Sequence, residues 1–164
     1  MKNLSTIIAL TATLGVSSAT AAEITIQGAV STSAALTVTP AAPYNVLDLG
    51  TDQTDLKVAT VNEKCNKHNG YTVTLASAKA VTVGGGTIAK LVGALPLPES
   101  LTYTMKYNTA VVTLVGGSAI VANETAKTLG IGVNKDLTIS YLGAAANLAA
   151  DTYSDTLTLT IAAK

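Results

Sequence analysis

The sequence predicts an all-β fold, an antiparallel β-sandwich or barrel, and three observations support this prediction. Apolar and polar residues alternate along most of the chain after residue 22, which is typical of strands with one buried face. Threonine is abundant and, together with valine and isoleucine, favours strands. Clusters of Gly, Pro, Asn and Asp separate the alternating runs at near-regular spacing, as they do in sandwiches and barrels.

The alternating runs define the expected strands in chain order. The clearest lie at residues 23–30, 70–77, 100–108, 135–143 and 151–164. Shorter candidates lie at residues 36–39, 56–61, 81–83, 87–92, 111–115 and 129–133. After residue 22 helical periodicity is weak, and neither a change of composition nor an internal repeat divides the chain. We therefore expect one domain over residues 23–164.

Residues 1–22 have the pattern of a secretory signal peptide. Lys2 supplies a positive start, a short and mostly apolar run follows, and Ala19 and Ala21 have the A-x-A spacing that precedes cleavage. The apolar run is shorter than the roughly 20 residues that span a bilayer. No later stretch is long and apolar enough either, so we expect an exported chain with no membrane span after signal removal.

The charge balance argues against two classes of partner. Lys+Arg and Asp+Glu both number 10, which gives a formal net charge of zero. A nucleic-acid-binding protein presents a clustered basic face, and anionic lipids are bound through polybasic segments. We expect neither nucleic acid nor an anionic membrane surface as a partner.

The single Cys and the single His, Cys65 and His68, lie three positions apart and raise the question of catalysis or metal binding. A catalytic Cys needs a base within hydrogen-bond reach and a third group that orients the base, and no such motif accompanies Cys65. A metal site needs three or four ligands, which would have to come from carboxylates that no spacing selects. We expect a loop that leads into the strand at 70–77. We expect no catalytic residue, metal site or cofactor, and no enzymatic activity.

Several segments resemble bacterial chaperone–usher pilin-like proteins, in particular the spore coat protein U and archaic fimbrial subunit group. The matching stretches are VNEKCNKHNGYTVTLAS at 61–77, DTYSDTLTLTIAAK at 151–164, EITIQGAVSTSAALTVTP at 23–40 and LDLGT at 47–51. The group usually carries a first cysteine in its opening strand, where this chain has Ser33, Ala34 and Ala35. Cys65 is therefore an unpaired thiol within the chain.

The resemblance implies an immunoglobulin-like sandwich that lacks its last strand and is completed by a donated one. It implies that the donor strand carries Ile24, Ile26, Gly28 and Val30, with Gly28 passing where the groove has no room for a side chain. The edge of the groove would be the terminal strand with Tyr153, Leu157, Leu159 and Ile161.

The implied partners are other copies of the chain or sibling pilin subunits, a periplasmic chaperone and an outer-membrane usher. The implied location is the periplasm in transit and then a surface fibre that serves adhesion or surface coating. The alternative is a self-contained secreted sandwich that binds a sugar or a surface ligand. A strand that a chain pairs with itself has the same periodicity as a donated one, so both functions remain open at this point.

Overall fold

A computed structural model describes residues 25–83, 86–96, 98–128, 130–144 and 147–164. By its internal contacts the chain divides into two units, Met1–Val30 and Ser31–Lys164. Residues 25–30 form no helix or strand, although a strand was predicted at 23–30. The predicted signal peptide, residues 1–22, lies outside the described residues. Among the described residues, no helix is long and apolar enough to span a membrane.

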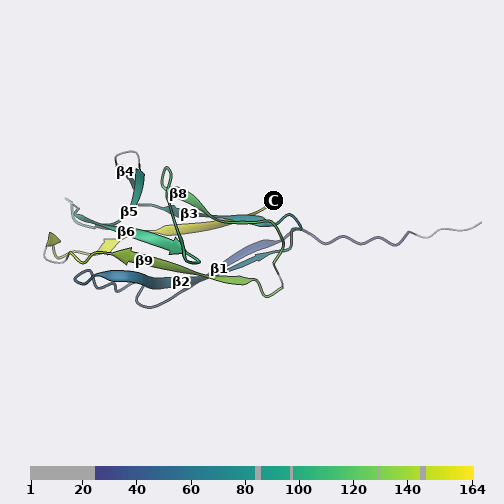
Figure 1. The fold of residues 1–164 in the computed structure, drawn as a ribbon, viewed down its shortest axis with the longest axis horizontal. Coiled ribbons are helices and arrows are strands. Elements are labelled where there is room, and N and C mark those ends of the chain that lie inside the picture. Colours follow the sequence, from purple (N-terminus) through teal and green to yellow (C-terminus); the bar gives the residue numbers. More distant parts are fainter. Residues whose placement is uncertain (1–24, 84–85, 97, 129, 145–146) are drawn as a thin grey trace, which may run out of the picture. The chain divides into compact units, whose positions relative to one another are not determined.

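The second unit is a sandwich of antiparallel strands, which confirms the predicted all-β class (Figure 1). Its larger sheet has the order β1-β2-β9-β6-β5-β10, with β4 paired to β5 and β7 to β6. Its smaller sheet has the order β11-β3-β8. The strands are β1 (Ala34–Pro40), β2 (Gln53–Cys65), β3 (Tyr71–Ser77), β4 (Val81–Val83), β5 (Gly86–Gly93), β6 (Ser100–Tyr107), β7 (Ala110–Val111), β8 (Ser118–Glu124), β9 (Val133–Tyr141), β10 (Tyr153–Ser154) and β11 (Leu157–Ala163).

The strand order follows the immunoglobulin pattern. Constant-type immunoglobulin domains arrange their strands as A-B-E-D in one sheet and C-F-G in the other. Here β1, β2, β9 and β6 take the places of A, B, E and D, while β3 and β11 take those of C and F. Among the described residues, no strand occupies the place of G, beside β11.

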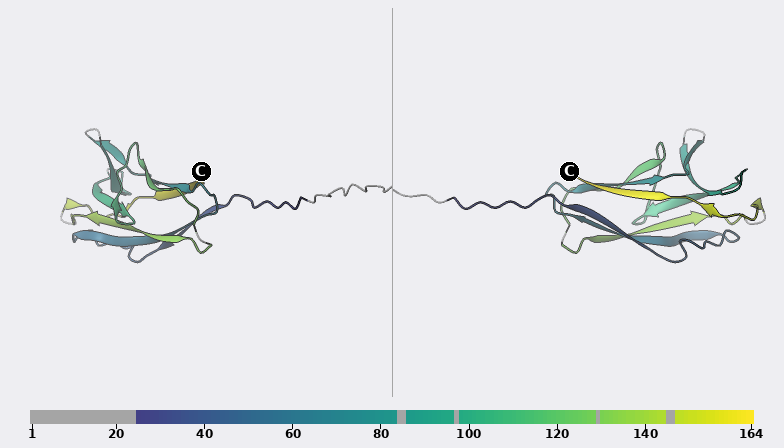
Figure 2. Two further views of the ribbon diagram at one scale, coloured as in Figure 1. Left: turned by 45° about the vertical axis from the view of Figure 1, so that its right-hand side comes forward. Right: turned by 180° about the vertical axis from the view of Figure 1, so that it is seen from behind.

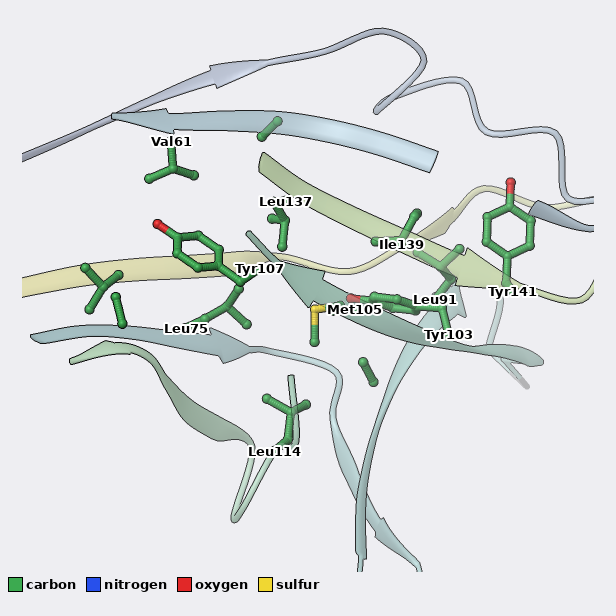
Figure 3. Packing of buried hydrophobic residues seen from close by; sticks show 14 of the residues in the cluster. Val61, Leu75, Leu91, Tyr103, Met105, Tyr107, Leu114, Leu137, Ile139 and Tyr141 are labelled. Carbon is green, nitrogen blue, oxygen red and sulfur yellow. The ribbon is translucent and has the colours of Figure 1, made fainter. Parts of the chain in front are cut away.

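The core lies between the two sheets and is built from aliphatic residues and tyrosines. In Figure 3, Tyr103, Met105 and Tyr107 of β6 point into the space between the layers, and Leu75 of β3 lies opposite them. The turn between β2 and β3 depends on Gly70, whose φ of 84° is left-handed. A Cβ at this position would collide with the backbone oxygen of Glu124, so only glycine fits.

Besides the run at 23–30, three of the predicted strands are wrong or incomplete, and one strand was missed. The run 151–164 is two strands in different sheets, because Asp155 interrupts it and accepts hydrogen bonds from Ser77 Oγ, Lys79 N and Thr156 N. Residues 130–132 form no strand, since β9 begins at Val133. Of the run 111–115, only Val111 belongs to a strand, β7. The missed strand is β8, whose alternation is broken by a bulge opposite Val73 and Thr74.

Candidate functional site: an open groove between β1 and β11

β1 and β11 are each an edge strand of their own sheet, lie close to each other and run antiparallel. In the right-hand view of Figure 2, β11 (yellow) and β1 (dark blue) both face the viewer. Their Ala34 and Lys164 ends lie together, because Ala34 pairs with Cys65, Lys164 N bonds to Gly70 O, and Cys65 Sγ lies 3.7 Å from Gly70 O. Each strand therefore has one edge that its own sheet leaves unpaired.

The free edge of β11 is defined by which of its residues bond to β3. Thr156 O accepts from Ala78 N, and Lys164 N donates to Gly70 O. Because hydrogen-bonded residues alternate along an antiparallel strand, the even-numbered residues between these two bond to β3. The backbone N–H and C=O groups of the odd-numbered residues point to the other edge: Leu157, Leu159, Ile161 and Ala163.

The same reasoning defines the free edge of β1. Ser33 O accepts from Asn66 N, and Ala41 N donates to Val58 O, so the odd-numbered residues of β1 bond to β2. The backbone groups of Ala34, Leu36, Val38 and Pro40 point away from β2, although Pro40 contributes only its carbonyl. Both edges thus offer backbone donors and acceptors from mostly apolar residues.

Between these edges the surface opens into an apolar groove. A cavity of about 210 Å³ lies at the Pro40 end and reaches core residues such as Leu137 and Ile139. Tyr44 and Leu47, from the loop after β1, border it, and it is lined further by Val38, Pro40, Val58, Ala59, Leu91, Tyr103, Asp155, Leu157 and Leu159. Among the described residues of the sandwich, no strand occupies this space.

The side chains of β11 show the effect of the missing neighbour. Leu157, Leu159 and Ile161 face the core but are only half-buried. On the adjacent strand β3, the corresponding Val73 and Leu75 are fully buried. Val38 of β1 is 44% exposed. This exposed apolar surface is the feature that a further strand would cover.

A polar cluster borders the Leu157 end of the groove. Asp155 Oδ2 accepts hydrogen bonds from Tyr103 Oη and Ser77 Oγ, both at 2.6 Å, and Oδ1 accepts from Lys79 N. Burial, followed by the bond to Asp155, raises the pKa of the Tyr103 hydroxyl. Asp155 therefore ties the start of β11 to both sheets and fixes where the groove ends.

A second buried cluster was not predicted from the sequence. Glu63 of β2 is fully buried and accepts hydrogen bonds from Tyr71 Oη at 2.7 Å and Tyr107 Oη at 2.6 Å. Lys135 Nζ lies 3.0 Å from Glu63 and 2.6 Å from Glu124 Oε1. The alternation correctly predicts that Tyr71 and Tyr107 point inward. Nothing in the sequence distinguishes Glu63 from the exposed polar residues around it.

Cys65 and His68 are not brought together as a catalytic pair. The Cys65 side chain is 3% exposed, and its Sγ lies 3.4 Å from Lys67 N, while His68 is exposed. Among the described residues, no group of three or more His, Cys, Asp or Glu side chains is placed to hold a metal ion.

The predicted groove-edge residues fall on two different strands. Leu157, Leu159 and Ile161 lie on β11, which is the edge of its sheet. Tyr153 lies instead on β10, paired with Gly93 of β5, and its assignment to the terminal strand is wrong. Of the predicted donor residues, Ile26 and Val30 are 94% and 90% exposed, and Ile24 lies outside the described residues.

Comparison with family models and with curated proteins finds no match to this chain. Among solved structures, the chain is similar to HdaB, the minor tip subunit of the Escherichia coli Hda pilus. Their identity is 17% and the TM-score 0.41, over 77% of this chain and 79% of HdaB. It is also similar to the CssB subunit of colonization factor CS6 from enterotoxigenic Escherichia coli, complemented with a donor strand from CssA. Here the identity is 16% and the TM-score 0.43, over 77% of this chain and 82% of CssB.

Proposed function

We propose that this protein is a structural subunit of a surface fibre that assembles by strand addition. The groove between β1 and β11 accepts an extended segment from another copy or from a sibling subunit. The chain's own segment from Ile24 to Val30 is donated in turn to a neighbour. The observation that carries this proposal is that β1 and β11 present two free edges whose inward apolar side chains remain half-covered.

The donor segment matches the groove in length and pattern. β1 and β11 are each seven residues long, and the segment from Ile24 to Val30 also spans seven. Its alternate positions are Ile24, Ile26, Gly28 and Val30, which would face inward as one set. Fully burying one Ile or Val side chain stabilises a complex by about 1.5–3 kcal/mol, and the backbone bonds to two edges add to this.

Export is part of the same proposal. A cleaved signal peptide would deliver the chain to the periplasm, where a chaperone would cover the groove until an outer-membrane usher exchanges it for a donor segment. Covering is necessary because an open apolar groove with free strand edges promotes aggregation. The assembled fibre would serve adhesion or surface coating, with no catalytic step.

The test is a gel of protein sheared from the surface of the producing cells, run in SDS with and without boiling. We expect a ladder of oligomers that collapses to one band on heating and persists under reductant. Deleting residues 23–30 should abolish the ladder. Ile26→Asp should do the same, because an unpaired carboxylate would be buried in the groove.

Gln27→Asp is the matched control, since it adds the same charge on the opposite face of the donor. It should leave the ladder intact. A single monomer band from unmodified protein, before any heating, would contradict the proposal and favour a self-contained secreted sandwich.

A further inference from the structure

Most charged side chains of the sandwich that form no salt bridge lie at its two ends, although the whole sequence is neutral. One end, here called the basic end, holds the β2–β3 turn and the start of β1. The other, the acidic end, holds the loops that precede β2 and follow β9. The basic end carries Lys64, Lys67, Lys127 and Lys164. The acidic end carries Asp48, Asp52, Glu99, Asp151 and Asp155.

Hydrogen bonds place these residues at opposite ends of the strands. At the basic end, Thr128, next to Lys127, bonds to Cys65 at the end of β2, and Lys164 N bonds to Gly70 O. At the acidic end, Asp52 accepts from Gly143 N just after β9, and Asp48 O accepts from Tyr141 Oη. β2 runs between the two ends over 13 residues. At about 3.3 Å per residue, the ends are roughly 40 Å apart.

Few charges of the opposite sign lie at either end. The salt bridges among the described residues join Lys57 to Asp136, Lys106 to Asp55, and Lys135 to Glu63 and Glu124. They include none of the four lysines or five carboxylates that define the two ends. Lys79 and Lys90 are the described lysines near the acidic end, and at the basic end Glu124 is already paired with Lys135.

Each end also exposes apolar side chains that a partner would cover. Ile131 is 81% exposed at the basic end, and its carbonyl accepts from Asn62 of β2. At the acidic end Leu142 is 74% exposed and Leu95 48%. An apolar centre with charges around it is the composition of a protein–protein interface.

We propose that the basic end of one copy docks on the acidic end of the next, so that this chain stacks head to tail with itself. The inference rests on the proposed function and names its partner as a second copy of this chain. Two different surfaces meet in such a contact, so it does not close and generates an open filament. At physiological ionic strength the Debye length is about 8 Å, so the two ends of one copy do not neutralise each other over the length of β2.

The position of the donor segment supports the same head-to-tail arrangement. Asn66 bonds to Ser31 O and Ser33 N, so the chain enters the sandwich at the basic end. The groove opens beside Pro40 and Leu157, near the acidic end. In a head-to-tail stack, the segment of the second copy therefore starts at the mouth of the first copy's groove. It would run from there along β11 in the antiparallel direction.

The test follows the assembly of purified mature chain into oligomers at two salt concentrations. We compare unmodified protein with Lys64→Glu/Lys67→Glu/Lys127→Glu, which reverses the basic end. At about 10 mM salt, where the Debye length is roughly 30 Å, we expect the reversed variant to assemble about tenfold more slowly. At about 1 M salt, where screening acts within roughly 3 Å, the two rates should converge.

Two further variants separate charge from folding. Lys79→Glu makes the same Lys-to-Glu change once, but at the acidic end, and should not slow assembly. Adding Asp48→Asn/Asp52→Asn/Glu99→Gln to the reversed variant should restore much of the rate, because the repulsion is removed while acceptor oxygens are kept. Thermal unfolding of each monomer confirms that all variants fold.

Each outcome decides a different question. If the reversed variant assembles at the unmodified rate at low salt, or equally slowly at both salt concentrations, the charged ends do not direct stacking. The proposed function would then stand without this inference. If the unmodified chain forms no oligomer at either concentration while protein sheared from the cell surface still gives its ladder, the charged ends do not direct stacking. If the sheared protein gives no ladder either, the proposed function fails and the inference fails with it.

Discussion

β3 and β11 are neighbours in the same sheet and carry the same alternation, yet their inward side chains differ in burial. Val73 and Leu75 of β3 are fully buried, whereas Leu159 and Ile161, which pair with them, are half-buried. β3 has a partner on both edges and β11 on one. The alternation of a strand therefore indicates which face is buried, while the number of neighbouring strands determines how completely.

The closed region of the sandwich, meaning the core between strands that have partners on both edges, should be far more sensitive to substitution than the groove. We expect the largest effect at Glu63. Glu63→Ala leaves Lys135 and two tyrosine hydroxyls without their buried partner, so we expect a loss of about 4 kcal/mol in the free energy of unfolding. The measurement is urea unfolding with and without Glu63→Ala, in a chain that also carries Ile26→Asp so that it stays monomeric. Glu124→Gln is the control and should cost much less, because the Glu124 side chain is 44% exposed. Equal losses would show that Glu63 does not hold the two sheets together.

The most direct comparison of the two strands uses Leu75 and Leu159, which are paired in register on β3 and β11. Leu75→Ala should cost about 3 kcal/mol in the monomer, because it leaves a cavity in a fully packed site. Leu159→Ala should cost about 1 kcal/mol, since its side chain is only half-covered. With a donor peptide of residues 23–30 bound, the cost of Leu159→Ala should rise toward that of Leu75→Ala. If Leu159→Ala costs as much as Leu75→Ala in the absence of the peptide, the groove is already filled.

High pH should weaken the closed region through its buried tyrosines and lysine. Burial, reinforced by Glu63, raises the pKa of Tyr71 and Tyr107. Burial lowers the pKa of Lys135, but its bonds to Glu124 and Glu63 outweigh this and leave it raised. A raised folded-state pKa stabilises the fold below the unfolded-state pKa and ceases to do so as pH rises through the folded value.

The melting temperature should therefore be steady up to about pH 10, the ordinary pKa of tyrosine, and fall above it. A Tyr71→Phe/Tyr107→Phe variant should lose less stability than the unmodified chain between about pH 10 and 12. An identical fall in both proteins would place the alkaline sensitivity elsewhere.

The smallest effect is expected at Cys65. Its thiol is buried, so it should react slowly with a thiol reagent in the folded chain and form no disulfide between subunits. Cys65→Ala should leave the heat-sensitive ladder unchanged on non-reducing gels. A ladder lost in this variant would mean that the thiol links subunits.

Much of the architecture is predictable from local pattern, and the remainder depends on contacts between distant segments. The alternation at 70–77 and 100–108 corresponds to β3 and β6, because each strand buries one face. The run at 151–164 does not show that Asp155 separates β10 from β11, since that break depends on Ser77 and Tyr103. β8 was missed because its bulge shifts the alternation by one residue. Glu63 could not be recognised, because its burial depends on partners from other strands.

The most direct test of the groove is hydrogen exchange at the backbone amides of β11, followed by NMR on the mature Ile26→Asp chain. The amides of Leu159 and Ile161 should exchange fast, and those of Thr158 and Thr160, bonded to β3, slowly. Adding the unmodified peptide of residues 23–30 should protect Leu159 and Ile161, while the peptide with Ile26→Asp should not. If Leu159 and Ile161 are protected before the peptide is added, or remain exposed after it, β11 is not the acceptor edge.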